Sequence, residues 1–539
     1  MVEVQKEKNN HWQRFKDYLF VDEGTHLQLD ISKVDFQDDY FMQMEARIQC
    51  VYGQMQDLEA GAIANPDENR MVGHYWLRDP KRAPSKKIEE EIIEALASVK
   101  EFAFQIHKGA ICGEEGKPFQ NVLVIGIGGS SLGPRFVSHA LGNMNDKMRL
   151  YFIDNTDPDG MDRIVDWIHG DLSRTLCVVV SKSGGTIETR NGMEEVRLFY
   201  QHRGLNFSKH AVSISQEGSI LDQLSKREGW LKQFPLWDWI GGRTSVLSAV
   251  GLLPLALQGL DIELLLEGAR QCDELTRKTE TRKNPGALLA LMWYRMTGGR
   301  GGKQMVLLPY KDRLELFTKY MQQLVMESLG KERDLDGNIV NQGIAVMGNK
   351  GSTDQHSYLQ QLLDGPDNFF VIFLEILKDR VSLSPIIAEE STSGDYLHAF
   401  LLGTRKSLAL KKRNSITITI GEINEASIGV LIALFERAVS MYAFLVHINA
   451  YHQPAVELGK KGAEEVIHLK NRIVQFLREH GEQEFTEEEL ANAISKNTDA
   501  EPEMVYKILQ HLIHNPESGL GARKNKKTGA FDDYYRFIK

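Results

Sequence analysis

The sequence predicts an α/β fold of two consecutive modules with parallel sheets, flanked by helical segments at both ends. Short apolar, β-branched runs recur about every thirty residues, and the stretches between them carry apolar side chains at helical spacing. Short buried strands alternating with helices are typical of a parallel sheet covered on both faces. The pattern stops at a glycine-rich break, residues 297–303, and then starts again, which indicates a second module.

The segments follow in order along the 539 residues. Residues 1–115 have no strand signal and are expected to be helical, as the apolar spacing over 87–104 indicates. The first module, 116–298, has apolar runs beginning at Asn121, Arg149, Thr175 and His210, and the second, 299–464, has runs beginning at Gln304, Gly343, Phe369 and Ser415. Residues 465–539 are predicted to form a small helix-rich region, whose basic stretch 523–527 we interpret as a solvated loop.

Composition excludes several classes of protein. The net charge is 64 − 74 = −10, which argues against a protein that coats nucleic acid or an anionic membrane. The four cysteines are too far apart in sequence for a zinc knuckle or a CxxC redox pair, and four in so long a chain do not make a disulfide framework. The N-terminus lacks the apolar core of a signal peptide. The longest apolar stretch, 427–451, is interrupted by Glu436 and Arg437, so we expect it to be a buried helix and not a membrane span. A reduced, cytoplasmic protein is expected.

A glycine-rich loop, Gly126–Pro134, follows the first predicted strand. Glycines there let backbone amides approach an anion closely. The dinucleotide fingerprint fails because position 131 is serine, and no Gly-Lys-Ser/Thr completes a Walker loop. Taken alone, this loop is either a tight structural turn or an anion site.

The third predicted strand runs into a second polar loop, Ser181–Thr189. Its first six residues place the hydroxyls of Ser181, Ser183 and Thr186 beside Lys182 at the head of a helix. One hydroxyl would be enough for a helix cap, so three beside a lysine favour a phosphate site. Because ligands of open α/β sheets bind at the carboxyl ends of strands, we expect a phosphorylated small molecule, either a nucleotide or a sugar.

Six motifs, taken together and in order, resemble the glucose-6-phosphate isomerase family. They are the loop 126–134, the segment 181–189, Trp237-Asp-Trp-Ile-Gly-Gly-Arg243, Gln322-Gln-Leu-Val-Met-Glu327-Ser-Leu-Gly-Lys331, Asp354-Gln-His356-Ser and Gln453-Pro-Ala-Val-Glu-Leu-Gly-Lys460. The resemblance covers roughly residues 40–465. This chain departs from the family pattern at Ser183-Gly184-Gly185, at Thr244 and at His452 and Ala455.

The resemblance implies two sugar-isomerase (SIS) modules, which are flavodoxin-like α/β/α sandwiches. It further implies reversible conversion of glucose 6-phosphate and fructose 6-phosphate in glycolysis and gluconeogenesis, a homodimer, and no metal or organic cofactor. The histidines of this chain form no HxH or HExxH pattern, and its carboxylates do not stand at calcium-loop spacing.

An aldose–ketose conversion needs a base, a group that opens the sugar ring and a cation that stabilises an enediolate. Glu327 is the candidate base, because it lies near the C-terminus of a predicted helix that ends at Gly330, where the potential suits a proton acceptor. His356 lies near a predicted helix N-terminus, which disfavours imidazolium. The spacing from Gln453 singles out Lys460 over its neighbour, and Arg243 follows two glycines.

The resemblance supplies the remaining roles. It assigns ring opening to His356, which would reach the site from a partner subunit, and to Lys460, which would assist. It assigns stabilisation of the enediolate to Arg243. The substrate phosphate would be held by Gly129, Ser130, Ser181, Lys182, Ser183 and Thr186, and the sugar would lie near Gln323 and Gln453.

Two other functions are compatible with parts of this pattern. A non-catalytic SIS protein that senses a sugar phosphate would need the phosphate loops but would not need Glu327, His356 and Lys460 together. The glucosamine-phosphate-forming amidotransferase needs a cysteine directly after the initiator methionine, and position 2 is valine here.

Overall fold

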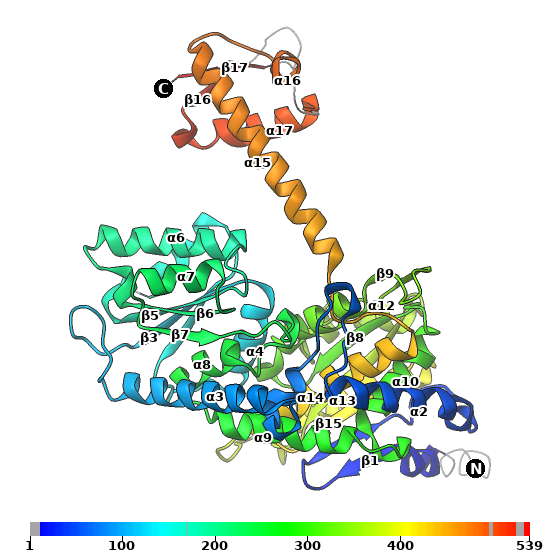
Figure 1. The fold of residues 1–539 in the computed structure, drawn as a ribbon. Coiled ribbons are helices and arrows are strands. Elements are labelled where there is room, and N and C mark those ends of the chain that lie inside the picture. The colour runs from blue at the N-terminus through cyan, green and yellow to red at the C-terminus, as the bar shows by residue number, and fades with distance from the viewer. Residues whose placement is uncertain (1–10, 169, 495–499, 524–532, 539) are drawn as a thin grey trace. The chain divides into compact units, whose positions relative to one another are not determined.

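The structure is a computed structural model that describes residues 11–168, 170–494, 500–523 and 533–538. The chain divides into two compact units, residues 1–452 and 453–539 (Figure 1). The predicted boundaries after residues 115 and 298 stay predictions, and so does the boundary after 464, which falls inside a continuous helix, Pro454–His480.

The first module holds a five-stranded parallel sheet in the order β4-β3-β5-β6-β7. Its strands are β3 (Asn121–Ile125), β4 (Arg149–Ile153), β5 (Thr175–Val180), β6 (Ala211–Ser215) and β7 (Lys232–Pro235). The first four confirm the predicted strands. The edge strand β7 was not predicted, because its sequence Lys-Gln-Phe-Pro is mostly polar and ends in proline.

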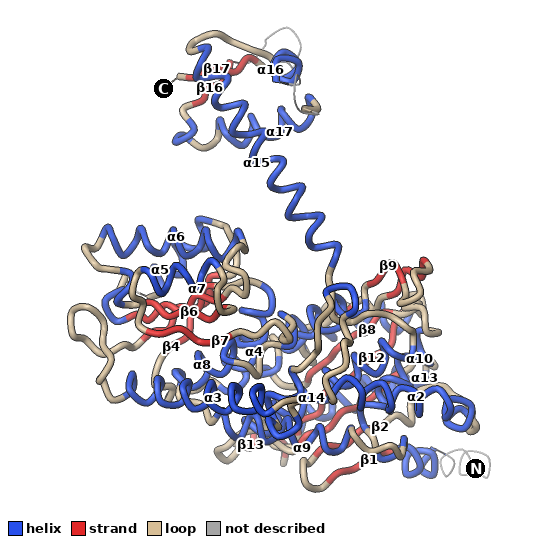
Figure 2. The backbone as a smooth tube through the Cα atoms, viewed as in Figure 1, coloured by secondary structure: helices blue, strands red, loops and turns tan. Residues whose placement is uncertain are grey.

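Helices cover both faces of this sheet (Figure 2). Val122 and Val124 of β3 belong to one apolar cluster, whereas Leu123 and Ile125 belong to another, because successive side chains of a strand point to opposite faces. The first cluster includes residues of α3 (Lys86–His107), α4 (Leu132–Leu141) and α8 (Ala249–Gln258); the second includes residues of α5 (Pro158–Trp167), α6 (Ile187–His202) and α7 (Ile220–Arg227). The predicted α/β/α layering is confirmed here.

The second module is built on a six-stranded sheet in the order β1-β2-β15-β12-β8-β11. Four of its strands are parallel: β8 (Gln304–Pro309), β11 (Val346–Met347), β12 (Phe369–Ile376) and β15 (Ser415–Ile420). These four correspond to the predicted runs. Two short hairpins lie outside this sheet, β9 (Lys331–Arg333) with β10 (Ile339–Gln342), and β13 (Ile386–Ala388) with β14 (Ser391–Thr392).

The expectation that the first 115 residues hold only helices is wrong. β1 (Leu19–Asp22) and β2 (Leu27–Asp30) form an antiparallel hairpin, and β2 pairs antiparallel with β15. Leu27 and Leu29 are fully buried while Gln28 between them is not. An alternation over four residues is too short to stand out in the sequence, and the strand exists because β15 offers a sheet edge.

Six further helices of the first unit include one long buried helix, α14. They are α2 (Tyr40–Glu59), α9 (Ile262–Thr276), α10 (Pro285–Thr297), α12 (Leu359–Asp364), α13 (Ser393–Leu410) and α14 (Glu425–Leu445). In the described part of the chain, α14 is the one helix long and apolar enough to cross a membrane, and 94% of its apolar window is buried inside the protein. It contacts α2, α9 and α10, as expected of a core helix.

The second unit has its own apolar core. It consists of α15 (Pro454–His480), α16 (Glu487–Ile494), α17 (Pro502–Ile513), β16 (Leu520–Arg523) and β17 (Tyr534–Phe537). Of the basic stretch 523–527, only Arg523 is described, and it pairs with Glu484; the loop interpretation concerns residues outside the described ranges.

Candidate active site

The loop after β3 lies directly against the backbone that precedes Arg243. A Cβ atom on Gly129 would come within 1.8 Å of the carbonyl oxygen of Gly242, so only glycine fits at position 129. Gly128 has φ +59°, and a Cβ there would lie 3.0 Å from the side-chain nitrogen of Gln323. The loop therefore brings three predicted motifs together, and Ser130 ends its short 3-10 turn, Gly128–Ser130.

The loop after β5 is tied together by its own hydroxyl groups. The Ser181 Oγ accepts a hydrogen bond from the Gly184 amide at 3.0 Å and lies 3.3 Å from the Thr186 Oγ1. The Ser183 Oγ accepts from the Gly185 amide at 3.1 Å. Thr186 is the N-cap residue of α6, yet its side chain makes no capping hydrogen bond. Simple capping therefore does not account for this cluster of hydroxyls.

Lys182 links this loop to the Trp237–Arg243 motif. Its Nζ donates to the carbonyl oxygens of Asp238 and Ile240 at 2.6 and 3.0 Å. Burial, assisted by the nearby Arg70 charge, lowers the pKa of Lys182 to about 8. The ammonium is thus partly desolvated, which strengthens its attraction for an anion.

Arg243 and Glu327 form an ion pair at the junction of the two modules. The Arg243 Nη1 lies 3.2 Å from the Glu327 Oε1, with side-chain exposures of 4% and 24%. The Nε donates to the Ser328 Oγ at 2.8 Å, and the Nη2 donates to the carbonyl oxygens of Ala450 and His452 at 2.7 and 3.2 Å. A guanidinium held on several sides is a fixed cation beside the predicted base.

Glu327 lies at the end of a π-helical segment, η10 (Gln322–Glu327), which continues from α11 (Phe317–Met321). The sequence predicted an ordinary helix here, and periodicity cannot distinguish the two over six residues. Gln323 lies on the same segment, with its amide against the first loop. Isolated π turns are frequently found at functional sites.

Sequence reasoning missed Lys331 as part of this site. Its side chain is buried, and its Nζ donates to the backbone carbonyl of Glu327 at 2.7 Å. Burial, together with the Arg243 charge, lowers the pKa of Lys331 to about 7. The only signal available was its place in the same motif as Glu327. A lysine that follows a glycine at the end of a helix is ordinarily expected to be solvated.

The segment Asn65–Arg70 was also missed. Asn449 donates to Asp67 at 2.6 Å and to Asn65 at 2.9 Å, and His452 lies 3.7 Å from Asp67. This segment therefore packs against the residues that hold Arg243. Its polar composition between two helical stretches resembled a connecting loop, which hid its role.

Three further predicted residues are not assigned to this pair, one for want of a contact with it among the described residues and two because they lie in the second unit. His356 is exposed on a 3-10 turn, Thr353–His356, and among the described residues no contact joins it to Arg243 or Glu327. Gln453 and Lys460 belong to the second unit, at and after the start of α15, so their participation stays a prediction. The described residues contain no group of three or more metal-ligating side chains placed to hold a metal ion.

Comparison with known proteins identifies related chains. A family model described as phosphoglucose isomerase matches residues 30–384 and 398–479. The chain is 60% identical over 509 residues to the glucose-6-phosphate isomerase of Desulfitobacterium hafniense (strain DSM 10664 / DCB-2), covering 94% of this chain and 95% of that protein. It is 54% identical over 530 residues to that of Geobacter sp. (strain M21), covering 98% and 99%. The crystal structure of a glucose-6-phosphate isomerase from Chlamydia trachomatis D/UW-3/Cx superposes with a TM-score of 0.77 at 28% identity, covering 85% and 90%.

Proposed function

Because the chain belongs to the phosphoglucose isomerase family, we propose that it reversibly converts glucose 6-phosphate to fructose 6-phosphate, a step of glycolysis and gluconeogenesis. It is an isomerase of aldose and ketose phosphates. The observation that carries the proposal is the Arg243–Glu327 pair beside two glycine- and hydroxyl-rich loops at the carboxyl ends of parallel strands.

The two loops would hold the substrate phosphate. Hydroxyls of the second loop, from Ser181, Ser183 and Thr186, with Ser130 and the Gly129 amide from the first loop, offer donors to its oxygens. Lys182 and the N-terminus of α6 supply positive potential. Such a site fixes one end of the sugar and leaves the carbonyl end to reach the ion pair.

Glu327 would transfer the proton. Its carboxylate takes the proton from C2 of the open-chain aldose to give an enediolate, the hydroxyl proton of O2 passes to O1, and the proton held by Glu327 returns to C1 to give the ketose. The negative charge that develops on the substrate oxygen is stabilised by Arg243, which is already held in position and needs no reorganisation. Gln323 and Gln453 would orient the sugar.

Ring opening would fall to His356 and Lys460. His356 is exposed on this chain, which suits a residue that acts in the site of a partner subunit. A homodimer would also cover large apolar side chains that are exposed at residues 377–402, where Val381 and Leu383 are 98% and 96% exposed. We therefore propose a cytoplasmic homodimer whose sites are completed across the interface and that needs neither metal nor cofactor.

The regulatory alternative is not favoured. Relatives that match nearly the whole chain are named as glucose-6-phosphate isomerases. A protein that only sensed a sugar phosphate would have no use for a buried arginine fixed against a carboxylate.

The test is an assay that couples formation of glucose 6-phosphate from fructose 6-phosphate to a dehydrogenase. We expect turnover without added metal, in the presence of a chelator. Mannose 6-phosphate should be tested alongside, because the Ser183–Gly185 sequence departs from the family pattern. Absence of turnover with fructose 6-phosphate in the purified full-length protein would contradict the proposal.

A further inference from the structure

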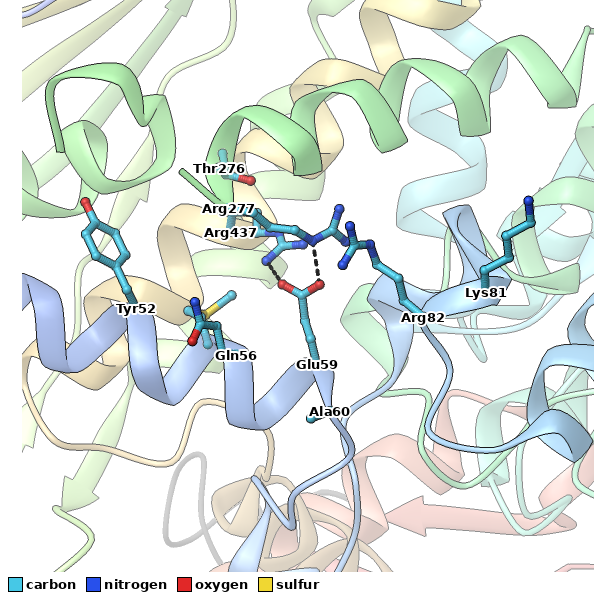
Figure 3. A pocket seen from close by; sticks show the side chains of 10 residues that line it. Tyr52, Gln56, Glu59, Ala60, Lys81, Arg82, Thr276, Arg277 and Arg437 are labelled. Carbon is cyan, nitrogen blue, oxygen red and sulfur yellow. Dashed lines mark hydrogen bonds and ion pairs between the residues drawn. The ribbon is translucent and has the colours of Figure 1, made fainter. Parts of the chain in front are cut away.

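A second polar pocket lies within the first unit, away from the loops described above. It has a volume of about 620 Å³ and is bounded by α2, the 3-10 turn η3 (Pro80–Arg82), the end of α9 and α14 (Figure 3). It shares no lining residue with the candidate active site. Its charged walls are four cations and one carboxylate, namely Lys81, Arg82, Arg277, Arg437 and Glu59. Pockets of this size hold small metabolites.

Two arginines of this pocket have side-chain nitrogens that donate no hydrogen bond. The fully buried Arg437 bonds Asp273 through Nε at 2.8 Å and Glu59 through Nη1, and its Nη2 has no hydrogen-bond partner. Arg277 bonds Glu59 through Nε at 2.8 Å; its Nη1 has no hydrogen-bond partner, and its Nη2 has only an ion pair with Asp273 at 3.6 Å. Buried donors are normally satisfied, so two unpartnered nitrogens beside one pocket, the Arg437 Nη2 and the Arg277 Nη1, indicate a missing acceptor.

The carboxylates around the pocket are already shared. Glu59 pairs with both Arg437 and Arg277. Asp273 pairs with Arg78 at 2.7 Å, with Arg437 at 2.8 Å and with Arg277 at 3.6 Å. Glu436, which pairs with Arg78 at 2.8 Å, supplies less than a full negative charge, because burial raises its pKa to about 7.

Positive charge therefore exceeds negative charge at this pocket. Burial and the Arg437 charge lower the pKa of Arg277. Lys81 and Arg82 add two exposed cations at the rim, of which Arg82 pairs with Asp79 at 2.9 Å. A bound anion would relieve the repulsion among these cations.

We propose that this pocket is a second anion site, which binds the phosphate group of a small metabolite between Arg277, Arg437 and the rim cations. Guanidinium groups match phosphate oxygens through paired donors, and two of them with unused nitrogens provide that arrangement. Tyr52 and Gln56 on α2 line the other side and would face the polar remainder of the ligand (Figure 3).

The test is equilibrium dialysis of the full-length protein with radiolabelled inorganic phosphate, which gives the number of sites per chain. Two sites are expected in the wild type, one in each phosphate-binding region. The double variant Lys81→Gln/Arg82→Gln should weaken one of them by roughly tenfold, because it removes two charges from the rim. Since both side chains are exposed, this variant should fold normally.

The matched control is Lys86→Gln/Lys87→Gln, which removes two exposed charges from the nearby start of α3 and should retain both sites. Arg277→Gln, checked for folding by near-ultraviolet circular dichroism, should abolish the same site as the rim variant. Lys182→Gln should instead weaken the other site. One site per chain in the wild type, or two unaltered sites in both the rim variant and Arg277→Gln, would overturn the proposal.

Discussion

Replacement of Arg243 by lysine tests whether the fixed guanidinium stabilises the enediolate. Arginine reaches Ser328, Glu327 and two backbone carbonyls through three separate nitrogens. Lysine keeps the charge but carries it on one nitrogen, so it cannot hold these partners and face the substrate at the same time. Loss of one such donor typically lowers kcat by about 10²–10³, or about 3–4 kcal/mol of transition-state stabilisation.

Stability should fall as well. Arg243 is buried, and Arg243→Lys gives up at least two charge-assisted hydrogen bonds, each contributing about 1.5–3 kcal/mol. We expect the free energy of unfolding to drop by about 3 kcal/mol or more, measured by urea denaturation. Because a folded but loosened site would mainly raise KM, kcat and KM are measured separately.

The control is Arg135→Lys, an exposed residue beside the first loop that pairs with Asp154 at 3.3 Å. It should change stability by less than about 1 kcal/mol and leave kcat near the wild-type value. A kcat for Arg243→Lys within about threefold of wild type would refute the role of the fixed guanidinium.

Further predictions concern the base, its neighbour, the partner subunit and the phosphate loop. The pKa of Lys331 is lowered from 10.5 to about 7, so keeping this side chain protonated below pH 7 lowers the stability of the folded state. The unfolded chain binds more protons above pH 7, so urea denaturation should show that the wild type gains roughly 2 kcal/mol more stability than Lys331→Met between pH 7 and 9; equal gains would contradict the shift. If the proposed homodimer shares its sites across the interface, mixing subunits of Glu327→Gln with His356→Asn should restore about a quarter of wild-type turnover, because half of the dimers would be hybrids with one intact site. No recovery after confirmed subunit exchange would contradict a site shared between subunits. Ser181→Ala and Thr186→Ala should each raise KM for fructose 6-phosphate by about 10-fold or more with a smaller effect on kcat, and an unchanged KM in both would remove the loop from the phosphate site.

Much of the fold could be predicted because its signals are local. The buried strands β3, β5, β8 and β12 are short apolar runs in the sequence, and glycines after β3 and β5 marked the two loops of the site. The β1–β2 hairpin could not be predicted, because β2 is a strand only against the edge of β15. The same holds for every feature that depends on a distant partner.

The same distinction between local and long-range signals applies to the candidate active site. Glu327 and Arg243 were identified by motif, and the structure brings them together from positions 84 residues apart (327 − 243). Their contact, the π turn and the buried Lys331 depend on tertiary packing that no spacing reveals. Residues 65–70 were overlooked because their role is to pack against a chain segment nearly 400 residues away.

The most direct test of the proposed mechanism is Glu327→Gln, assayed for isomerisation and for binding of 6-phosphogluconate. The amide preserves the shape of the side chain but cannot accept the C2 proton, so turnover should fall to background while the analogue binds with nearly wild-type affinity. Loss of turnover with retained binding is the predicted result. Near-normal turnover would show that another group is the base and would contradict the account.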